Sequence, residues 1–218
     1  MYLYYISYVV PGTILFPLGI AGFRYTAIET RLRIIFYYLL LSLFFNSVTT
    51  VLAEFGQNNL PLFHLFTVLE GAILLFFYRK CLGDHLNKNV FWILFTGFCC
   101  FCLVNSFFIQ NLFSFNTYSR FAEALVIICF SLYFFYTTLE TKTPGRWYKE
   151  PLIMINIGLL IYFSSSLLLF LFSQVLLSNR QANVLAWGIH ATLVMIMYVL
   201  FAIGFFNYKS VTLYPKIN

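Results

Sequence analysis

Long apolar segments alternate with short polar segments along the whole chain. Each apolar segment has roughly 17–25 residues, the length that a helix needs to cross a lipid bilayer. The segments between them are rich in Gly, Pro, Asn and charged residues, which are typical of turns between helices. The pattern predicts an all-α, polytopic membrane protein that folds as a single seven-helix domain over residues 1–218. The expected spans are residues 3–23, 33–55, 61–79, 89–110, 117–138, 152–177 and 183–206.

The composition supports the same class of protein. Of the 218 residues, 61% are hydrophobic and 9% are charged, whereas about 25% of the residues of a soluble domain are charged. The first span lacks a cationic leader and a small-residue cleavage site, so we expect a retained helix, kinked at Pro11 and Pro17, and not a signal peptide. The five cysteines lie in or beside apolar segments and match no disulfide or zinc pattern.

The cationic residues are unevenly distributed between the predicted spans. The segments on one side contain only Arg120 and Arg180. By the positive-inside rule, the N-terminus is expected outside and the C-terminus in the cytoplasm. This asymmetry also accounts for the net charge of +6 without nucleic acid as a partner. The cations of the predicted cytoplasmic side are Arg24, Arg31, Arg33, Arg79, Lys80, Lys88, Lys142, Arg146, Lys149, Lys209 and Lys216.

The third predicted span carries ionisable residues inside an apolar segment. His64, Thr67 and Glu70 are three residues apart and therefore share one broad face of the helix. An ionisable residue in the membrane costs roughly 2.5–3.5 kcal/mol on insertion scales, so it is a candidate for function and needs a partner. Gly71 lies beside this face and is expected to let another helix approach closely.

Polar residues of other spans are expected at a similar depth. With the predicted topology, the polar residues of several helices converge on the outer half of the membrane. We therefore predict an outward-facing polar pocket between the helices. The candidate ligand-binding residues are Asn46, His64, Glu70, Asn105, Glu123, Trp187 and His190.

Each of these residues also has a structural interpretation. Glu123 can form a surface ion pair with Arg120 at i−3, and Glu70 can pair with His190 for packing alone. Glu54 is interpreted as the end of its helix in the headgroup region, and Trp187 as an interfacial belt residue. The asparagines of the second and fourth spans can simply link helices by hydrogen bonds.

Several familiar chemistries fit the pattern poorly. A retinal protein needs a lysine in its last span, and this chain has none there before Lys209. The His and Glu residues of the spans could supply zinc ligands, but no two of them are three or four residues apart on one helix, and no HExxH motif is present. The seven-helix hydrolases of the ceramidase and adiponectin-receptor superfamily have two histidines four residues apart in their last helix, where this chain has only His190. A proton relay lacks a second polar track toward the cytoplasm. The candidate site therefore includes no assigned metal ligands, the cofactor is unknown, and the sequence leaves open whether a metal is bound.

Four segments carry a resemblance to a known family. They read NNLPLFHLFTVLEGAILLFFY, NSFFIQNLFSFNTYSRFAEALVIICFSLYFFY, LLIYFSSSLLLFLFS and WGIHATLVMIMYVLFAIGF. Over residues 40–207 the chain resembles a family of uncharacterised seven-span membrane proteins that is common in the Bacteroidota. The resemblance implies a multi-pass protein of the bacterial inner membrane and recurring positions at His64, Glu70, Glu123, Trp187 and His190. It implies an acidic residue in the second helix, where this chain has Asn46, and it implies no activity.

Three functions are compatible with the sequence. The first is a sensory or receptor-like module whose pocket takes a ligand from outside and whose cytoplasmic loops contact a signalling partner. The second is an intramembrane enzyme that acts on a lipid or isoprenoid-like substrate, with Glu70 or Glu123 and His190 as acid and base or as metal ligands. The third is a structural or assembly subunit of a membrane complex. The lipid bilayer is the common partner of all three, and neither the ligand nor the oligomeric state follows from the sequence.

Overall fold

Residues 4–141, 149–172, 176 and 178–208 are described by a computed structural model of the chain. These residues form helices and connecting turns, with no strand among them. Six described helices are long and apolar enough to cross a membrane, with a shorter apolar helix at Val10–Phe23. The fold is therefore all-helical, as the hydrophobic pattern predicts. The long helices are α4 (Thr30–Glu54), α5 (Leu60–Leu82), α6 (Lys88–Val104, continued by the π-helical turn η3, Asn105–Ile109), α7 (Thr117–Thr141), α8 (Pro151–Leu171) and α10 (Arg180–Asn207).

The N-terminal apolar segment is an interrupted helix. It consists of a π-helical turn, η1 (Tyr5–Val9), a single turn, α2 (Val10–Gly12), and α3 (Leu15–Phe23). The interruption at residues 13–14 lies three to four residues before Pro17, whose ring excludes a regular hydrogen bond to that turn. The helix is therefore interrupted near Pro17, and the break divides the region where the sequence predicts a single span over residues 3–23.

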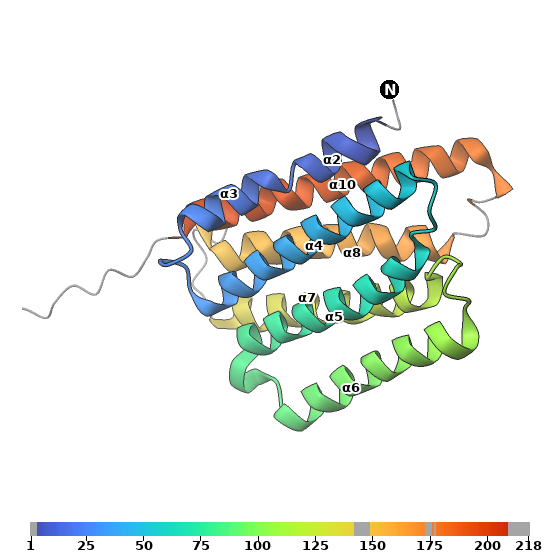
Figure 1. Cartoon of the computed structure of the whole chain (residues 1–218). Coiled ribbons are helices and arrows are strands. Elements are labelled where there is room, and N and C mark those ends of the chain that lie inside the picture. Colours follow the sequence, from blue (N-terminus) through green and yellow to red (C-terminus); the bar gives the residue numbers. More distant parts are fainter. Residues whose placement is uncertain (1–3, 142–148, 173–175, 177, 209–218) are drawn as a thin grey trace, which may run out of the picture.

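The helices lie side by side with α8 at the centre, flanked by α7 and α10 (Figure 1). Half of the apolar window of α8 is buried, against 22% for α6, which lies at the edge of the bundle beside α5. α3 runs along the outer side of α10. Side chains of the central helix α8 can therefore contact both α7 and α10, whereas most of the surface of α6 faces outward.

Small and polar residues hold the central helices together. A Cβ on Gly158 of α8 would lie 3.0 Å from the Phe201 ring of α10, so glycine is what permits this close approach. Asn156 of α8 accepts a hydrogen bond from the Tyr78 hydroxyl at 2.8 Å and donates one to the Ser131 carbonyl at 3.1 Å. All three helices, α5, α7 and α8, are thus connected through one buried amide.

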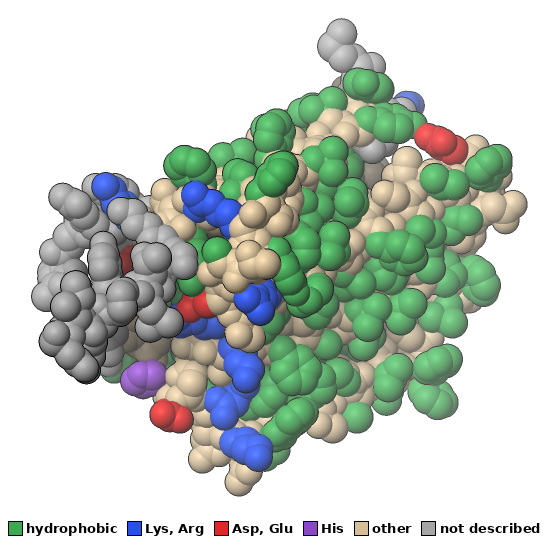
Figure 2. All heavy atoms as spheres, turned by 60° about the vertical axis from the view of Figure 1, so that its left-hand side comes forward, with side chains coloured by type: hydrophobic (Ala, Val, Ile, Leu, Met, Phe, Trp, Pro, Cys, Tyr) green, Lys and Arg blue, Asp and Glu red, His purple; other side chains and the backbone are tan. Residues whose placement is uncertain are grey.

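All described lysines and arginines except Arg120 and Arg180 lie at one end of the bundle. Figure 2 shows Lys and Arg side chains in a band at this end, next to a flank that is almost entirely hydrophobic. Arg24 donates hydrogen bonds to the carbonyls of Phe206 at 2.7 Å and Tyr208 at 3.0 Å, and so caps the C-terminus of α10. The described cations at this end are Arg24, Arg31, Arg33, Arg79, Lys80, Lys88 and Lys149, and Lys142, Arg146, Lys209 and Lys216 lie outside the described residues.

Candidate functional site

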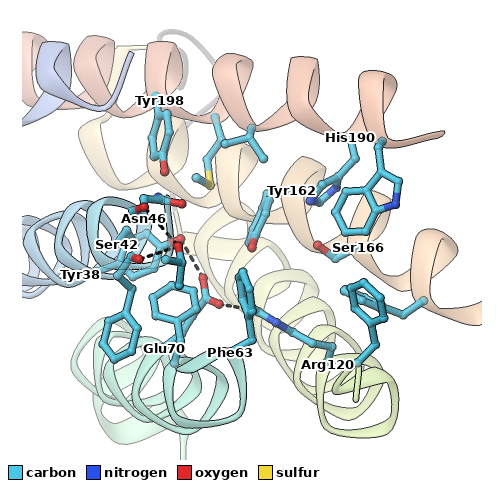
Figure 3. Close-up of a pocket in the computed structure, with 18 residues that line it drawn as sticks. Tyr38, Ser42, Asn46, Phe63, Glu70, Arg120, Tyr162, Ser166, His190 and Tyr198 are labelled. Carbon is cyan, nitrogen blue, oxygen red and sulfur yellow. Dashed lines mark hydrogen bonds and ion pairs between the residues drawn. The ribbon is translucent and has the colours of Figure 1, made fainter. Parts of the chain in front are cut away.

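A cavity of about 240 Å³ lies between α4, α5, α7, α8 and α10 (Figure 3). It is nearer to the end of the bundle where α5, α7 and α10 begin, which is the end opposite the cation-rich one. Its aromatic lining residues are Tyr38, Phe45, Phe63, Phe66, Phe115, Tyr162, Phe170, Trp187 and Tyr198, and its polar ones are Ser42, Asn46, Thr49, Glu70, Arg120, Ser166 and His190.

A buried ion triad forms one wall of the cavity. Nη1 of Arg120 forms a salt bridge with Oε2 of Glu70 and lies 3.0 Å from Oε2 of Glu123. The side chain of Arg120 is 11% exposed and those of the two glutamates are 1% exposed. The Tyr38 hydroxyl donates a hydrogen bond of 3.0 Å to Oε1 of Glu70, and the guanidinium lies 5.1 Å from the centre of the Phe66 ring. The triad therefore connects α4, α5 and α7.

The triad contains two carboxyl groups and one guanidinium. With both carboxylates ionised, Glu70, Glu123 and Arg120 have a formal sum of −1. Oε1 of Glu123 is buried and has no hydrogen-bond partner among the described residues. An unbalanced charge in a low-dielectric environment is costly, and removing one partner of a buried ion pair costs about 3–5 kcal/mol. Such a cluster therefore favours the approach of a positive group.

His190 faces the cavity from α10. Its Nδ1 lies 2.9 Å from Oγ of Ser165, and that hydroxyl donates to the Tyr162 carbonyl at 2.8 Å. Because the hydroxyl proton is used by the carbonyl, Nδ1 carries the ring proton and donates to Ser165. Nε2 is then an acceptor. The rings of Tyr162 and Trp187 lie 5.5 Å and 5.9 Å from the imidazole and hold its orientation.

A second polar cluster lies outside the cavity, next to the loop that follows η3. His64 contacts Oγ of Ser106 at 2.9 Å through Nδ1 and the Ser114 carbonyl at 3.2 Å through Nε2. Nδ2 of Asn105 donates to Oγ of Ser119 at 2.8 Å, and Asn116 donates to Thr67 at 3.0 Å. These bonds attach the loop to α5 and α7, so the cluster stabilises one end of the bundle.

The structure divides the candidate residues between these two places. Asn46, Glu70, Trp187 and His190 line the cavity. Glu123 lies behind Arg120 and reaches the cavity only through it. The remaining two candidates, His64 and Asn105, belong to the second cluster.

Two structural interpretations of these residues need correction. Arg120 and Glu123 do form the i,i+3 pair, but the pair is buried and shared with Glu70, so it is not a surface ion pair. Glu70 and His190 form no hydrogen bond or ion pair within the described part of the chain; their partners are Arg120 with Tyr38 and Ser165, respectively. Glu54 is at the end of α4, where it accepts a hydrogen bond from the Tyr8 hydroxyl.

Sequence reasoning missed the central residue of the site. Arg120 lies near the start of α7, where a cation is easily assigned to the membrane surface. One signal was available in the sequence. An arginine three residues before a glutamate in a membrane helix can form an ion pair with that glutamate and a second ion pair with a carboxylate on another helix. Nothing in the sequence distinguishes Tyr38, Tyr162 and Tyr198 from the other tyrosines of the chain, which has 16 in all.

The close approach of another helix to Gly71, expected from the sequence, is confirmed by the structure. The ring of Phe98 from α6 occupies the space that a Cβ on Gly71 would need, and Oε1 of Glu123 would lie 3.4 Å from that atom. The absence of a side chain at this position therefore lets α6 and the triad pack against the same turn of α5.

The described residues contain no group of three or more His, Cys, Asp or Glu side chains placed to hold a metal ion. The site is thus defined by the cavity, the ion triad and the imidazole. Comparison of the chain with protein-family models, with curated proteins and with solved structures finds no match in any of the three.

Proposed function

We propose that this chain is a receptor-like membrane module that takes a small ligand into the cavity from outside the cell. In this proposal the N-terminal apolar segment is a seventh span, the N-terminus is outside and the C-terminus is cytoplasmic. The support for this orientation is that seven of the nine described lysines and arginines lie at the end opposite the cavity, whereas only Arg120 and Arg180 are found at the cavity end. The membrane is then a bacterial inner membrane, as the family resemblance implies.

The observation that carries the proposal is the position of the ion triad in the cavity wall. Glu70 lines the cavity and is bound by groups from two other helices, Tyr38 of α4 and Arg120 of α7. A ligand that changes these contacts changes the relative stability of helix arrangements, which is the thermodynamic requirement for a switch. The volume of about 240 Å³ is below the range of about 300–1,000 Å³ for drug-sized ligands, so the ligand is small.

The route to a partner follows the helices. α5, α7 and α10 run from the cavity to the cation-rich end, so that a shift at Glu70 or Arg120 displaces the loops beyond them. A separate signalling protein that binds these loops would read the displacement.

The geometry favours an enzyme less. Both oxygens of Glu70 are already bound, one by Arg120 and one by Tyr38. His190 donates its Nδ1 proton to Ser165, so it does not activate that hydroxyl as a nucleophile.

Complementation in the host tests the proposal. The gene is deleted and replaced by the wild type, by Glu70→Gln, or by Glu54→Gln as a matched control on α4 outside the cavity, and the transcript profiles are compared. We expect the Glu70→Gln profile to match the deletion at normal protein levels in the membrane, and Glu54→Gln to match the wild type. Full complementation by Glu70→Gln would refute a signalling role for the cavity.

A further inference from the structure

We propose that the ligand of the cavity is a small organic cation, an amine that carries an ammonium group. This inference rests on the proposed function, because it names the class of ligand for the same cavity. Three observations carry it: the charge of the ion triad, the aromatic lining, and the unused hydrogen-bond acceptors.

The charge of the triad selects against an anion. Arg120 is the only arginine or lysine in the described lining, and it already binds Glu70 and Glu123. An anionic ligand would have to break one of these ion pairs and would lie beside two carboxyl groups. A cation next to Glu70 breaks no ion pair and, with both carboxylates ionised, brings the cluster to neutrality.

The lining selects for an organic cation over a metal ion. Tightly bound metal ions usually take several His, Cys, Asp or Glu ligands around one point, and the described residues contain no group of three or more such side chains. Aromatic rings instead surround the cavity, contributed by α4, α5, α8 and α10. Ring faces attract ammonium groups by about 0.5–2 kcal/mol, more when water is excluded, while they pack against the apolar part of the same ligand.

Hydrogen-bond acceptors remain free at the cavity wall. Ser42 lines the cavity and is 2% exposed. Its Oγ has no hydrogen-bond partner among the described residues. Nε2 of His190 is an acceptor in the tautomer fixed by Ser165. Each oxygen of Glu70 accepts one hydrogen bond and has a lone pair left. An ammonium group supplies only donors and so matches these groups.

Three probes of the same shape test the ligand class on the purified full chain in lipid nanodiscs. The probes are 2-phenylethylamine, 2-phenylethanol and phenylacetate, which are cationic, neutral and anionic at pH 7. Binding is measured by titration calorimetry and by the shift of the thermal unfolding midpoint. We expect the amine to bind at least about tenfold more tightly than the alcohol and the acid to bind most weakly.

Two variants and one control locate the binding. Glu70→Gln makes the triad formally neutral and should reduce the preference for the amine over the alcohol about tenfold, whereas Glu54→Gln should leave it unchanged. If Glu70→Gln fails to fold, Ser42→Ala serves instead, with an expected loss of about fivefold for the amine.

The results separate the two proposals. Equal binding of the amine and the alcohol would mean that a proton already balances the triad, and would overturn the cation proposal while the receptor proposal stands. Preferred binding of the acid, or no binding of any probe, would also overturn it. Only the complementation result with Glu70→Gln decides whether the cavity signals.

Discussion

Arg120 of α7 forms a salt bridge with Glu70 of α5, a residue 50 positions away in the sequence. Both side chains are buried, and Glu123 completes the pair into a triad. Such a buried contact fixes two helices relative to each other, because separating the partners leaves a buried charge unpaired.

Replacement of Arg120 by glutamine should strongly destabilise the bundle. The change leaves two carboxylates buried and close together without their shared cation, which is expected to cost about 3–5 kcal/mol. The measurement is the free energy of unfolding of the purified protein in detergent. Arg180→Gln, at the exposed start of α10, is the matched control and should change it little.

The same triad allows a rescue. Combining Arg120→Gln with Glu70→Gln and Glu123→Gln removes all three charges and should recover a large part of the lost free energy. A triple variant as unstable as Arg120→Gln alone would show that the guanidinium acts through packing and not through charge.

Gly71→Ala should destabilise the contact between α5 and α6. The new Cβ clashes with the ring of Phe98, and overpacking of this kind costs about 1–3 kcal/mol. Thermal unfolding measures the effect, and Gly97→Ala on α6, where a Cβ meets no atom within 4 Å, is the control. Adding Phe98→Ala to Gly71→Ala should relieve the clash, and no relief would place the strain elsewhere.

Asn156→Ala should loosen the centre of the bundle. It deprives the buried Tyr78 hydroxyl of its acceptor and removes one of the two bonds to the Ser131 carbonyl, and a buried polar group left without a partner costs about 1–3 kcal/mol. Equilibrium unfolding of Asn156→Ala, Tyr78→Phe and the double variant forms a cycle that isolates the hydrogen bond between them. Additive effects would contradict the interaction, and the exposed Asn89→Ala controls for loss of an amide.

The proposed orientation predicts opposite labelling of two exposed turns. In a variant without native cysteines, Gln57→Cys should react with a membrane-impermeant maleimide on intact cells. Asp84→Cys, at the cation-rich end, should react only after the inner membrane is opened. The reverse pattern would invert the topology and place the cavity toward the cytoplasm.

The sequence predicted the helices well because their signal is local. Apolar runs of bilayer length and the breaks at Gly56, Asn87 and Pro151 depend on neighbouring residues only. It also identified Glu70 and His190 as residues that need partners, since an ionisable side chain in an apolar run is conspicuous in itself. It did not identify those partners, and the pairing of Glu70 with His190 that it allowed is not found among the described residues.

By itself, the sequence determined an all-helical chain with membrane-length apolar segments and cations concentrated in alternate turns. Only the tertiary structure decided that Arg120 joins Glu70 and Glu123, that His190 binds Ser165, and that His64 and Asn105 belong to a separate cluster. The physical reason is that periodicity fixes which face of a helix a residue occupies, whereas the rotation and depth of one helix against another depend on packing at contacts such as Gly71 with Phe98.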